Sequence, residues 1–241
     1  MLTRSEIKYI QSLCQKKNRE QEKLFLAEGP KLAEELLNSD WDIVKIYALQ
    51  SWIEQQPDAI KQRTTMVSEK ELAQISELQT PNQVVLLIRQ KAMSDKAMKH
   101  SWTIVLDGIQ DPGNLGTIIR IADWFGVKQI VCSADTAELY NPKVVQSTMG
   151  SFVRVNIVYT DIENFLRNTD KPVYGAMLNG NSLFTMKHIQ EGILVIGNES
   201  KGIRKNIQPF IGQKITIPRL GGAESLNAAV ATGIILSHLV L

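Results

Sequence analysis

From residue 102 onward, short apolar runs alternate with segments of helical spacing, and this alternation restricts the possible folds more than any other feature. The apolar runs have the length of buried strands, and the segments between them carry apolar residues three and four positions apart. Strands separated by helices predict a parallel sheet with helices on both faces, in which ligands bind at the carboxyl ends of the strands. The predicted strands are 102–106, 129–132, 153–158, 173–177, 193–197 and 214–217, and the predicted helices are 114–125, 142–148, 162–168, 204–210 and 225–239.

A second and less regular alternation precedes residue 90. The polar and small residues of 90–100 interrupt both patterns and predict a linker. A length of 241 residues fits two domains. We therefore predict a smaller α/β domain at 1–93 and a second domain at 94–241. The smaller domain has predicted helices at 3–17, 30–38, 53–60 and 69–76, and predicted strands at 25–29, 43–49, 65–68 and 84–89.

Composition and residue spacing exclude several classes of protein. No run reaches the ~18 consecutive apolar residues of a membrane span, and the first residues lack an apolar signal region, so a cytoplasmic protein without a membrane segment is expected. Cys14 and Cys132 lie far apart and form no metal-binding pair. His100, His188 and His238 stand in neither metal-ligand nor catalytic-triad spacing, so no metal is predicted.

Local charge is more informative than the net charge of +2. Basic residues concentrate in 1–31 and again in 200–222, where no acidic residue occurs between 200 and 222. Such runs often form only a solvated face of a protein. Because the second run lies beside a glycine-rich loop, the distribution favours a polyanionic partner.

The first of three loops at predicted strand ends contains Asp111, Asn114 and Gly116, and it precedes an amphipathic helix. Arg120 lies on that helix between apolar positions. A guanidinium there must bind an anion or reach solvent, because burying it unpaired is costly. A structural salt bridge is the alternative interpretation of Arg120.

The second loop follows the strand at 193–197. Gly197 and Gly202 have the spacing of a phosphate-binding Walker loop, but Ile203 and Arg204 replace the required Lys and Ser/Thr, which excludes that site. No GxGxxG motif follows the first strand of the second domain, so a dinucleotide site lacks its fingerprint. Glu199 is either a site residue or an ordinary turn residue.

The third loop, 217–227, contains Gly221, Gly222, Ser225 and Asn227 and opens a helix that is apolar on nearly every side. A helix of this kind must be buried, and its loop has the small residues and backbone N–H groups of a ligand site. The alternative is a core helix with Ser225 as its N-cap. With a Walker loop, a dinucleotide fingerprint, a catalytic triad and a metal site excluded, the three loops are expected to bind one ligand, largely through backbone groups.

The three loops carry DPGNLGTIIRIAD, IGNESKGI and IPRLGGAESLNAAVATGI, in that order. Together with NPKVVQSTMGSFVRV, they resemble the signature motifs of the SpoU-type (TrmH-like) RNA ribose 2'-O-methyltransferases of the SPOUT superfamily, over roughly 102–241. The stretch CQKKNREQEKLFLAEGPKLAEELL resembles the ribosomal-protein-like RNA-binding domain that many members of this family carry at the N-terminus.

This resemblance implies a C-terminal trefoil knot, a bent S-adenosylmethionine bound by the knot loops, and a homodimer with its active site at the interface. It implies catalytic-site roles for Asn114, Arg120, Glu199, Ser225 and Asn227. It implies cofactor contacts, mainly through backbone groups, at Met177, Leu178, Asn179, Gly180, Gly197, Ile217 and Leu226. The basic residues expected to contact RNA are Lys16, Lys17, Arg19, Lys201, Arg204 and Lys205.

The implied reaction is methyl transfer to a ribose 2'-OH of RNA. Ribosomal RNA is favoured over transfer RNA because of the added N-terminal domain. Arg120 is expected to hold the target phosphate and polarise the 2'-OH, since a pKa above ~12 makes arginine a poor general base. The alternatives are a transfer-RNA ribose methyltransferase and a non-catalytic RNA-binding or ribosome-assembly protein with the same fold.

Overall fold

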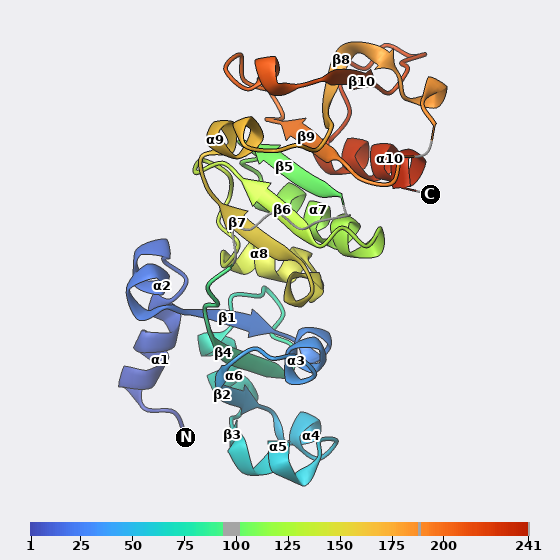
Figure 1. Ribbon diagram of the computed structural model, residues 1–241. Helices are drawn as coiled ribbons and strands as arrows, with labels where there is room; N and C mark the ends of the chain where they lie inside the picture. The colour runs from blue at the N-terminus through green and yellow to red at the C-terminus, as the bar shows by residue number, and fades with distance from the viewer. Residues whose placement is uncertain (94–101, 188, 241) are drawn as a thin grey trace. The chain divides into compact units, whose positions relative to one another are not determined.

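The computed structural model describes residues 1–93, 102–187 and 189–240 (Figure 1). Within these residues the chain divides into two compact units. The first unit holds Met1–Ala92 and Tyr140–Val153, and the second holds the rest of the described chain. The sequence-based division at residue 93 lies beside the first change of unit, but it does not assign the segment 140–153 to the first unit. The predicted linker at 90–100 lies mostly outside the described residues.

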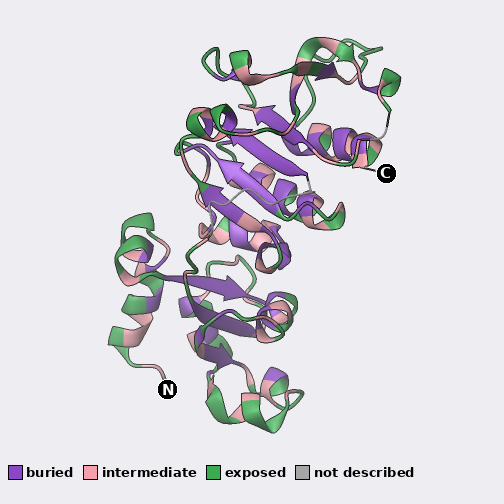
Figure 2. Cartoon of the chain, in the orientation of Figure 1, coloured by how far each residue is buried: buried purple, intermediate pink, exposed green. Residues whose placement is uncertain are grey.

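The centre of the first unit is a sheet of β1 (Leu24–Glu28), β4 (Val84–Arg89), β2 (Ile43–Ala48) and β3 (Thr64–Met66), in that order. β4 pairs antiparallel with β1 and β2, and β2 pairs in parallel with β3. Figure 2 shows β1 and β4 as the buried centre of the unit, and β3 is only partly covered. The unit therefore combines a mixed sheet with helices.

Short helices surround this sheet, and two of the predicted boundaries are wrong. The helix expected at 3–17 is two helices, because Gln15 adopts an extended conformation between them. The helix expected at 53–60 is also two helices, because Pro57 disfavours helical geometry in the residue before it. The helices are α1 (Arg4–Ser12), α2 (Lys16–Glu22), α3 (Pro30–Leu37), α4 (Gln50–Ile53), α5 (Asp58–Arg63), α6 (Glu69–Ile75) and α8 (Pro142–Ser147).

An aromatic cluster of Phe25, Trp41, Tyr140 and Phe152 joins the segment 140–153 to the rest of the first unit. The ring of Phe25 lies 4.7 Å from that of Tyr140, and the ring of Trp41 lies 5.1 Å from that of Phe152, measured between centroids. The edge-to-face geometry of the second pair, with an interplanar angle of 83°, is a favourable one for aromatic rings. The segment is therefore part of the core of this unit.

The second unit contains a six-stranded sheet whose paired strands are all parallel. This confirms the predicted parallel sheet. Its strands, in order across the sheet, are β10 (Gln213–Thr216), β8 (Val173–Ser182), β9 (Ile193–Gly197), β5 (Thr103–Asp107), β6 (Gln129–Cys132) and β7 (Asn156–Tyr159).

Helices cover both faces of this sheet. On one face, Val105 and Val195 pack in the same apolar cluster as Ile162 of α9 (Ile162–Arg167). The alternate residues of each strand point to the opposite face, which α7 (Pro112–Trp124) and α10 (Ala228–Val240) contact through β6 and β9. β5 is consequently buried along its whole length.

The prediction of a helix at 204–210 is wrong. The structure forms a turn there, followed by the short 3-10 helix η3 (Gln208–Phe210). The backbone N–H of Arg204 donates to the Asp107 carboxylate, 2.7 Å away, so this part of the chain is held in a loop. Pro209 adds no N–H donor for a continuing helix.

The start of the last helix also differs from the prediction. α10 begins at Ala228, and Asn227, not Ser225, caps it: its Oδ1 accepts from the N–H groups of Ala229 at 2.9 Å and Val230 at 3.3 Å. A side-chain oxygen that accepts these N–H groups is the usual N-cap arrangement. Ser225 is therefore free of the capping role that the sequence suggested.

Candidate active site

Three loops of the second unit follow the carboxyl ends of β5, β9 and β10. β9 pairs with β5 and with β8, which in turn pairs with β10. Because all these strands are parallel, their carboxyl ends meet at one edge of the sheet. The three glycine-rich loops of the sequence are thereby brought to the same edge.

Asn114 connects all three loops. Its Nδ2 donates to Glu199 Oε1 at 2.9 Å, and its Oδ1 accepts from Asn227 Nδ2 at 2.8 Å. The orientation of the Asn114 carboxamide is therefore fixed at both ends. Three of the five residues expected at the catalytic site form one hydrogen-bonded group, although they are far apart in the sequence.

The first loop is further ordered around this group. Asp111 caps α7 by accepting the N–H of Asn114 at 2.8 Å, and Pro112 occupies the first helical position. The Glu199 carboxylate also lies 3.5 Å from the backbone N atoms of Gln110 and Asp111. Glu199 thus faces three N–H donors of the first loop, which attach the second loop to the first.

Arg120 does not join the group formed by Asn114, Glu199 and Asn227. It lies six positions after Asn114 on α7, and the two side chains are separated by about 120° around the helix axis. Its side chain is exposed, and the described part of the chain gives it no ion-pair partner. Among the described residues, the structural salt bridge considered for Arg120 is therefore not formed, and the guanidinium is available to an external anion.

Ser225 also lies apart from the hydrogen-bonded group. It is exposed in the loop before α10, and within 1–93, 102–187 and 189–240 no hydrogen bond to its side chain is found. The structure therefore gathers Asn114, Glu199 and Asn227 and leaves Arg120 and Ser225 open to solvent.

The residues expected to contact the cofactor lie at the ends of β8, β9 and β10. Opposite β10, the register of β8 jumps: Lys214 pairs with Gly175 and Ile215 pairs with Asn181. The segment 176–180, which contains Met177, Leu178, Asn179 and Gly180, therefore bulges out of the ladder. Leu178 and Leu226 are 76% and 49% exposed, so the loops present uncovered apolar side chains. Gly197 ends β9, and Ile217 follows β10 directly.

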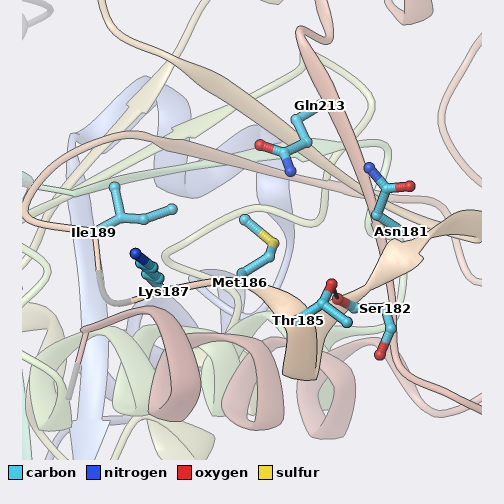
Figure 3. A pocket seen from close by; sticks show the side chains of 7 residues that line it. All are labelled: Asn181, Ser182, Thr185, Met186, Lys187, Ile189 and Gln213. Atoms are coloured by element: carbon cyan, nitrogen blue, oxygen red, sulfur yellow. Dashed lines mark hydrogen bonds between the residues drawn. The ribbon is translucent and has the colours of Figure 1, made fainter.

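A hollow of about 520 Å³ lies next to this bulge, and Figure 3 shows its lining side chains. Asn181 and Ser182 come from the end of β8, and Gln213 begins β10. None of the expected catalytic residues lines this hollow. It is therefore distinct from the group around Asn114.

Comparison with known proteins decides the family. The model of the SpoU rRNA methylase family matches residues 101–237, more than half of the chain. The chain belongs to the SpoU rRNA methylase family. A second model, the MRM3-like substrate binding domain, matches residues 4–86.

Three relatives extend this similarity over almost the entire chain. The 23S rRNA (guanosine(2553)-2'-O)-methyltransferase RlmP of Bacillus subtilis is 30% identical over 238 residues, which cover 97% of this chain and 95% of that protein. The AdoMet-bound rRNA methyltransferase of Sinorhizobium meliloti is 33% identical, with a TM-score of 0.87 over 99% of this chain and 95% of that one. A TrmH-family structure from Porphyromonas gingivalis is 34% identical, with a TM-score of 0.84 over 99% and 98% of the two chains.

A buried aspartate that the sequence motifs do not mark holds the second of the three loops. The side chain of Asp107, at the end of β5, is fully buried and pairs with the Arg204 guanidinium as well as with the Arg204 backbone N–H. Asn198 Nδ2 donates to the carbonyl oxygen of Gly108 at 2.7 Å. These contacts attach the loop that carries Glu199 to the end of β5. An acidic residue directly after a buried parallel strand was the available signal.

A second carboxylate supports this attachment. The hydroxyl of Ser133 donates to Asp135 at 2.6 Å and, with the charge of Arg204, keeps the pKa of Asp135 below its ordinary value. Arg204 Nη1 lies 3.7 Å from the same carboxylate. Arg204 is therefore engaged by two acidic residues, and the expectation that it grips RNA backbone is not supported.

The remaining basic residues expected to contact RNA differ in their exposure to solvent. The prediction for Arg19 is wrong. Only 2% of Arg19 is exposed, and its Nη1 donates to the carbonyl oxygens of Leu13 at 2.9 Å and Cys14 at 2.7 Å, beyond the end of α1. It stabilises the end of that helix and cannot contact RNA. Lys17, Lys201 and Lys205 are exposed, and Lys16 is exposed with Glu20 3.7 Å away.

Two absences concern only the part of the chain that the structure describes. No cluster of three or more His, Cys, Asp or Glu side chains there is arranged to hold a metal ion. His100 and His188 lie outside that part. No helix within it has the length and apolar character to cross a bilayer.

Gly197 is expected to tolerate no side chain. A Cβ at this position would lie 2.2 Å from the carbonyl carbon of Gly202 and 2.3 Å from the N of Ile203. Gly197→Ala should therefore displace the loop that carries Glu199 and destabilise the protein by about 1–3 kcal/mol. Thermal unfolding measures this effect, with Gly212→Ala as the control, since a Cβ there meets Val173 O at an ordinary 3.6 Å. Equal melting temperatures for the two variants would contradict the prediction.

Proposed function

We propose that the chain transfers the methyl group of S-adenosylmethionine to a ribose 2'-OH of RNA, with ribosomal RNA as the favoured substrate. The observation that carries this proposal is the bonding of Asn114 to both Glu199 and Asn227, which joins the three family loops. The family match and the relative that is named a 23S rRNA 2'-O-methyltransferase support it.

The loops around the end of β8 fit the proposed cofactor. The bulge at 176–180 offers backbone groups outside a regular ladder, and Gly197 ends the neighbouring strand β9. Exposed Leu178 and Leu226 offer apolar surface for an adenine ring. Bound S-adenosylmethionine supplies an activated methyl group on a sulfonium. Met177, Asn179, Gly180 and Ile217 are assigned to the same backbone cradle. What remains for the protein is to align the 2'-OH and assist the loss of its proton.

We assign these tasks to the five site residues. Arg120 would bind the phosphate next to the target ribose and polarise the 2'-OH, which suits a guanidinium that has no partner in the described chain. Asn114, held by Glu199 and Asn227, would orient the ribose. Glu199 would act by fixing Asn114. Ser225 would contribute its hydroxyl when substrate closes the loop before α10.

We further propose that the active form is a homodimer. Val230 on α10 is 51% exposed, and Trp124 at the end of α7 is 84% exposed, so two helices that contact each other present uncovered apolar side chains. A second copy of the chain would cover this surface and bring another protomer close to Arg120. The trefoil knot and the cytoplasmic location remain predictions; the resemblance to SPOUT methyltransferases supports the first.

One experiment tests the activity and separates the alternatives. The protein is incubated with methyl-labelled S-adenosylmethionine and either total ribosomal or total transfer RNA, and the labelled nucleotide is then mapped by primer extension. Label at a ribose of ribosomal RNA is expected. Label in transfer RNA alone would favour the transfer-RNA enzyme. Absence of label from both, with no heat of cofactor binding in calorimetry, would favour the non-catalytic RNA-binding protein.

A further inference from the structure

A second hollow, remote in sequence from the three loops, lies in the first unit. It has a volume of about 390 Å³ and is bounded by α3, by the segment from α4 to α5, and by the turn before β4. Pockets for small organic groups in proteins are typically ~300–1,000 Å³. The hollow is therefore large enough for a group such as a nucleobase.

The lining of this hollow is rich in carboxamides and poor in charge. Among the described residues that line it, only Glu34 is charged, and none is a lysine or arginine. Trp52, which is 3% exposed, contributes to an apolar wall together with neighbouring proline, leucine and isoleucine side chains. The carboxamides come from Asn38, Gln55, Gln56 and Gln83. This combination fits a neutral ring with hydrogen-bonding edges and disfavours a phosphate.

The four carboxamides fall into two pairs. Gln55 Nε2 donates to Ser51 O at 3.0 Å, and Gln56 Nε2 donates to Trp52 O at 3.3 Å, so bonds to the preceding helix α4 fix both side chains. Neither Asn38 nor Gln83 has a side-chain hydrogen-bond partner in the described chain. A carboxamide offers both donors and an acceptor, which can pair with two adjacent groups on the edge of a base. Two such groups therefore remain available at the rim.

The backbone of Gln83 is also unusual. Its φ of +60° is in the left-handed region, which residues other than glycine seldom adopt. The Gln83 carbonyl oxygen accepts the N–H of Leu49 at 2.9 Å, which ties the turn to the start of α4. Strained backbone of this kind is concentrated at ligand sites. The turn thus holds the Gln83 side chain at a defined place on the rim.

A cation suited to the RNA backbone lies close to the hollow in sequence. Lys31 is exposed in the first turn of α3, one helical turn before Glu34, and no ion pair to it is found among the described residues. Phosphate contacts position an RNA, whereas base contacts provide selectivity. Lys31 would supply the first kind of contact and the carboxamides the second.

We propose that this hollow binds an unpaired nucleobase of the RNA substrate. The proposal rests on the proposed function, since it requires RNA as the ligand. Single-stranded and looped RNA is recognised by proteins through bases that leave the stack and bond to side chains along their edges. The hollow would select a single-stranded or bulged element of the substrate, at a position separate from the methylated ribose.

The test uses the full chain and a fluorescent single-stranded RNA of twelve nucleotides with mixed sequence, compared with a duplex of the same length. The double variant Asn38→Ala/Gln83→Ala should bind the single strand about 5- to 100-fold more weakly, the loss expected for a bidentate base contact. The salt dependence of binding should stay unchanged, because no phosphate contact is removed. Affinity for the duplex should change less than about twofold.

Two control variants sharpen the result. Gln74→Ala removes an exposed carboxamide on α6 and should leave single-strand binding unchanged. Lys31→Ala should reduce the salt dependence by about one phosphate contact. If the double variant melts at a lower temperature than the parent protein, the single variant Asn38→Ala, at an exposed position, repeats the test.

The outcomes separate the base site from the proposed function. Unchanged single-strand affinity of the variants, in a protein that still methylates RNA, would overturn the base site alone. Equal losses for single strand and duplex would also overturn it, since they indicate a backbone contact. If the unchanged protein neither binds nor methylates any RNA, the proposed function fails and the base site fails with it.

Discussion

Arg120→Ala is expected to lower the rate of methyl transfer to RNA by about 100- to 1,000-fold, the usual loss when one group that stabilises the transition state is removed. The affinity for S-adenosylmethionine should change little, because Arg120 lies on the exposed side of α7 and the cofactor is assigned to the ends of β8, β9 and β10. Single-turnover methylation with labelled cofactor measures the rate, and calorimetry measures the affinity.

Two further variants make this result specific. Arg120→Lys keeps the charge but loses the two-pronged geometry of the guanidinium, so it should recover only part of the rate. Arg167→Ala removes an exposed arginine on α9, where it pairs with Glu163 at 2.7 Å, and should leave the rate unchanged. Loss of cofactor affinity in Arg120→Ala, with a normal rate at saturating cofactor, would overturn the role assigned to Arg120.

Phe152→Ala is expected to destabilise the first unit by about 3–5 kcal/mol, the range for removing a buried aromatic ring. Phe152 is 1% exposed, and its ring packs 5.1 Å from that of Trp41 and 5.9 Å from that of Phe25. The truncation leaves a cavity beside two large side chains that have few ways to fill it. Urea unfolding followed by tryptophan fluorescence measures the loss, because Trp41 and Trp52 both report on this unit.

Phe184→Ala is the matched control for that measurement. Phe184 lies in the second unit and is 63% exposed, so its removal should change the free energy of unfolding by less than about 0.5 kcal/mol. A loss below about 1 kcal/mol for Phe152→Ala would contradict the view that residues 140–153 belong to the core of the first unit.

The sequence predicts the regular elements of the second unit well, because buried parallel strands are continuous apolar runs. It fails at 204–210, where helical spacing is outweighed by a tertiary contact: Asp107 binds both the backbone and the side chain of Arg204. It fails for Arg19 for a similar reason. A basic residue in a basic segment is expected to face solvent. The two carbonyl oxygens that bind the buried Arg19 side chain come together only in the folded chain.

The site is predictable to the extent that motifs mark it. Asn114, Glu199 and Asn227 all stand in the family motifs, and the structure joins them through hydrogen bonds. The positions of Arg120 and Ser225 depend on helix phase and loop conformation, which motif spacing does not encode. Asp107 was missed because a single aspartate after a strand is common, and its importance depends on a partner 97 positions later in the chain.

The placement of residues 140–153 has a practical consequence for building chimaeras. The polypeptide leaves the first unit after residue 92, returns at 140, and departs again at 153. A fragment that ends at residue 92 would thus lack Tyr140 and Phe152, which belong to the core of the first unit. A chimaera that exchanges the first unit between two relatives must therefore exchange residues 140–153 as well. Otherwise the core of the first unit would combine side chains from two different proteins.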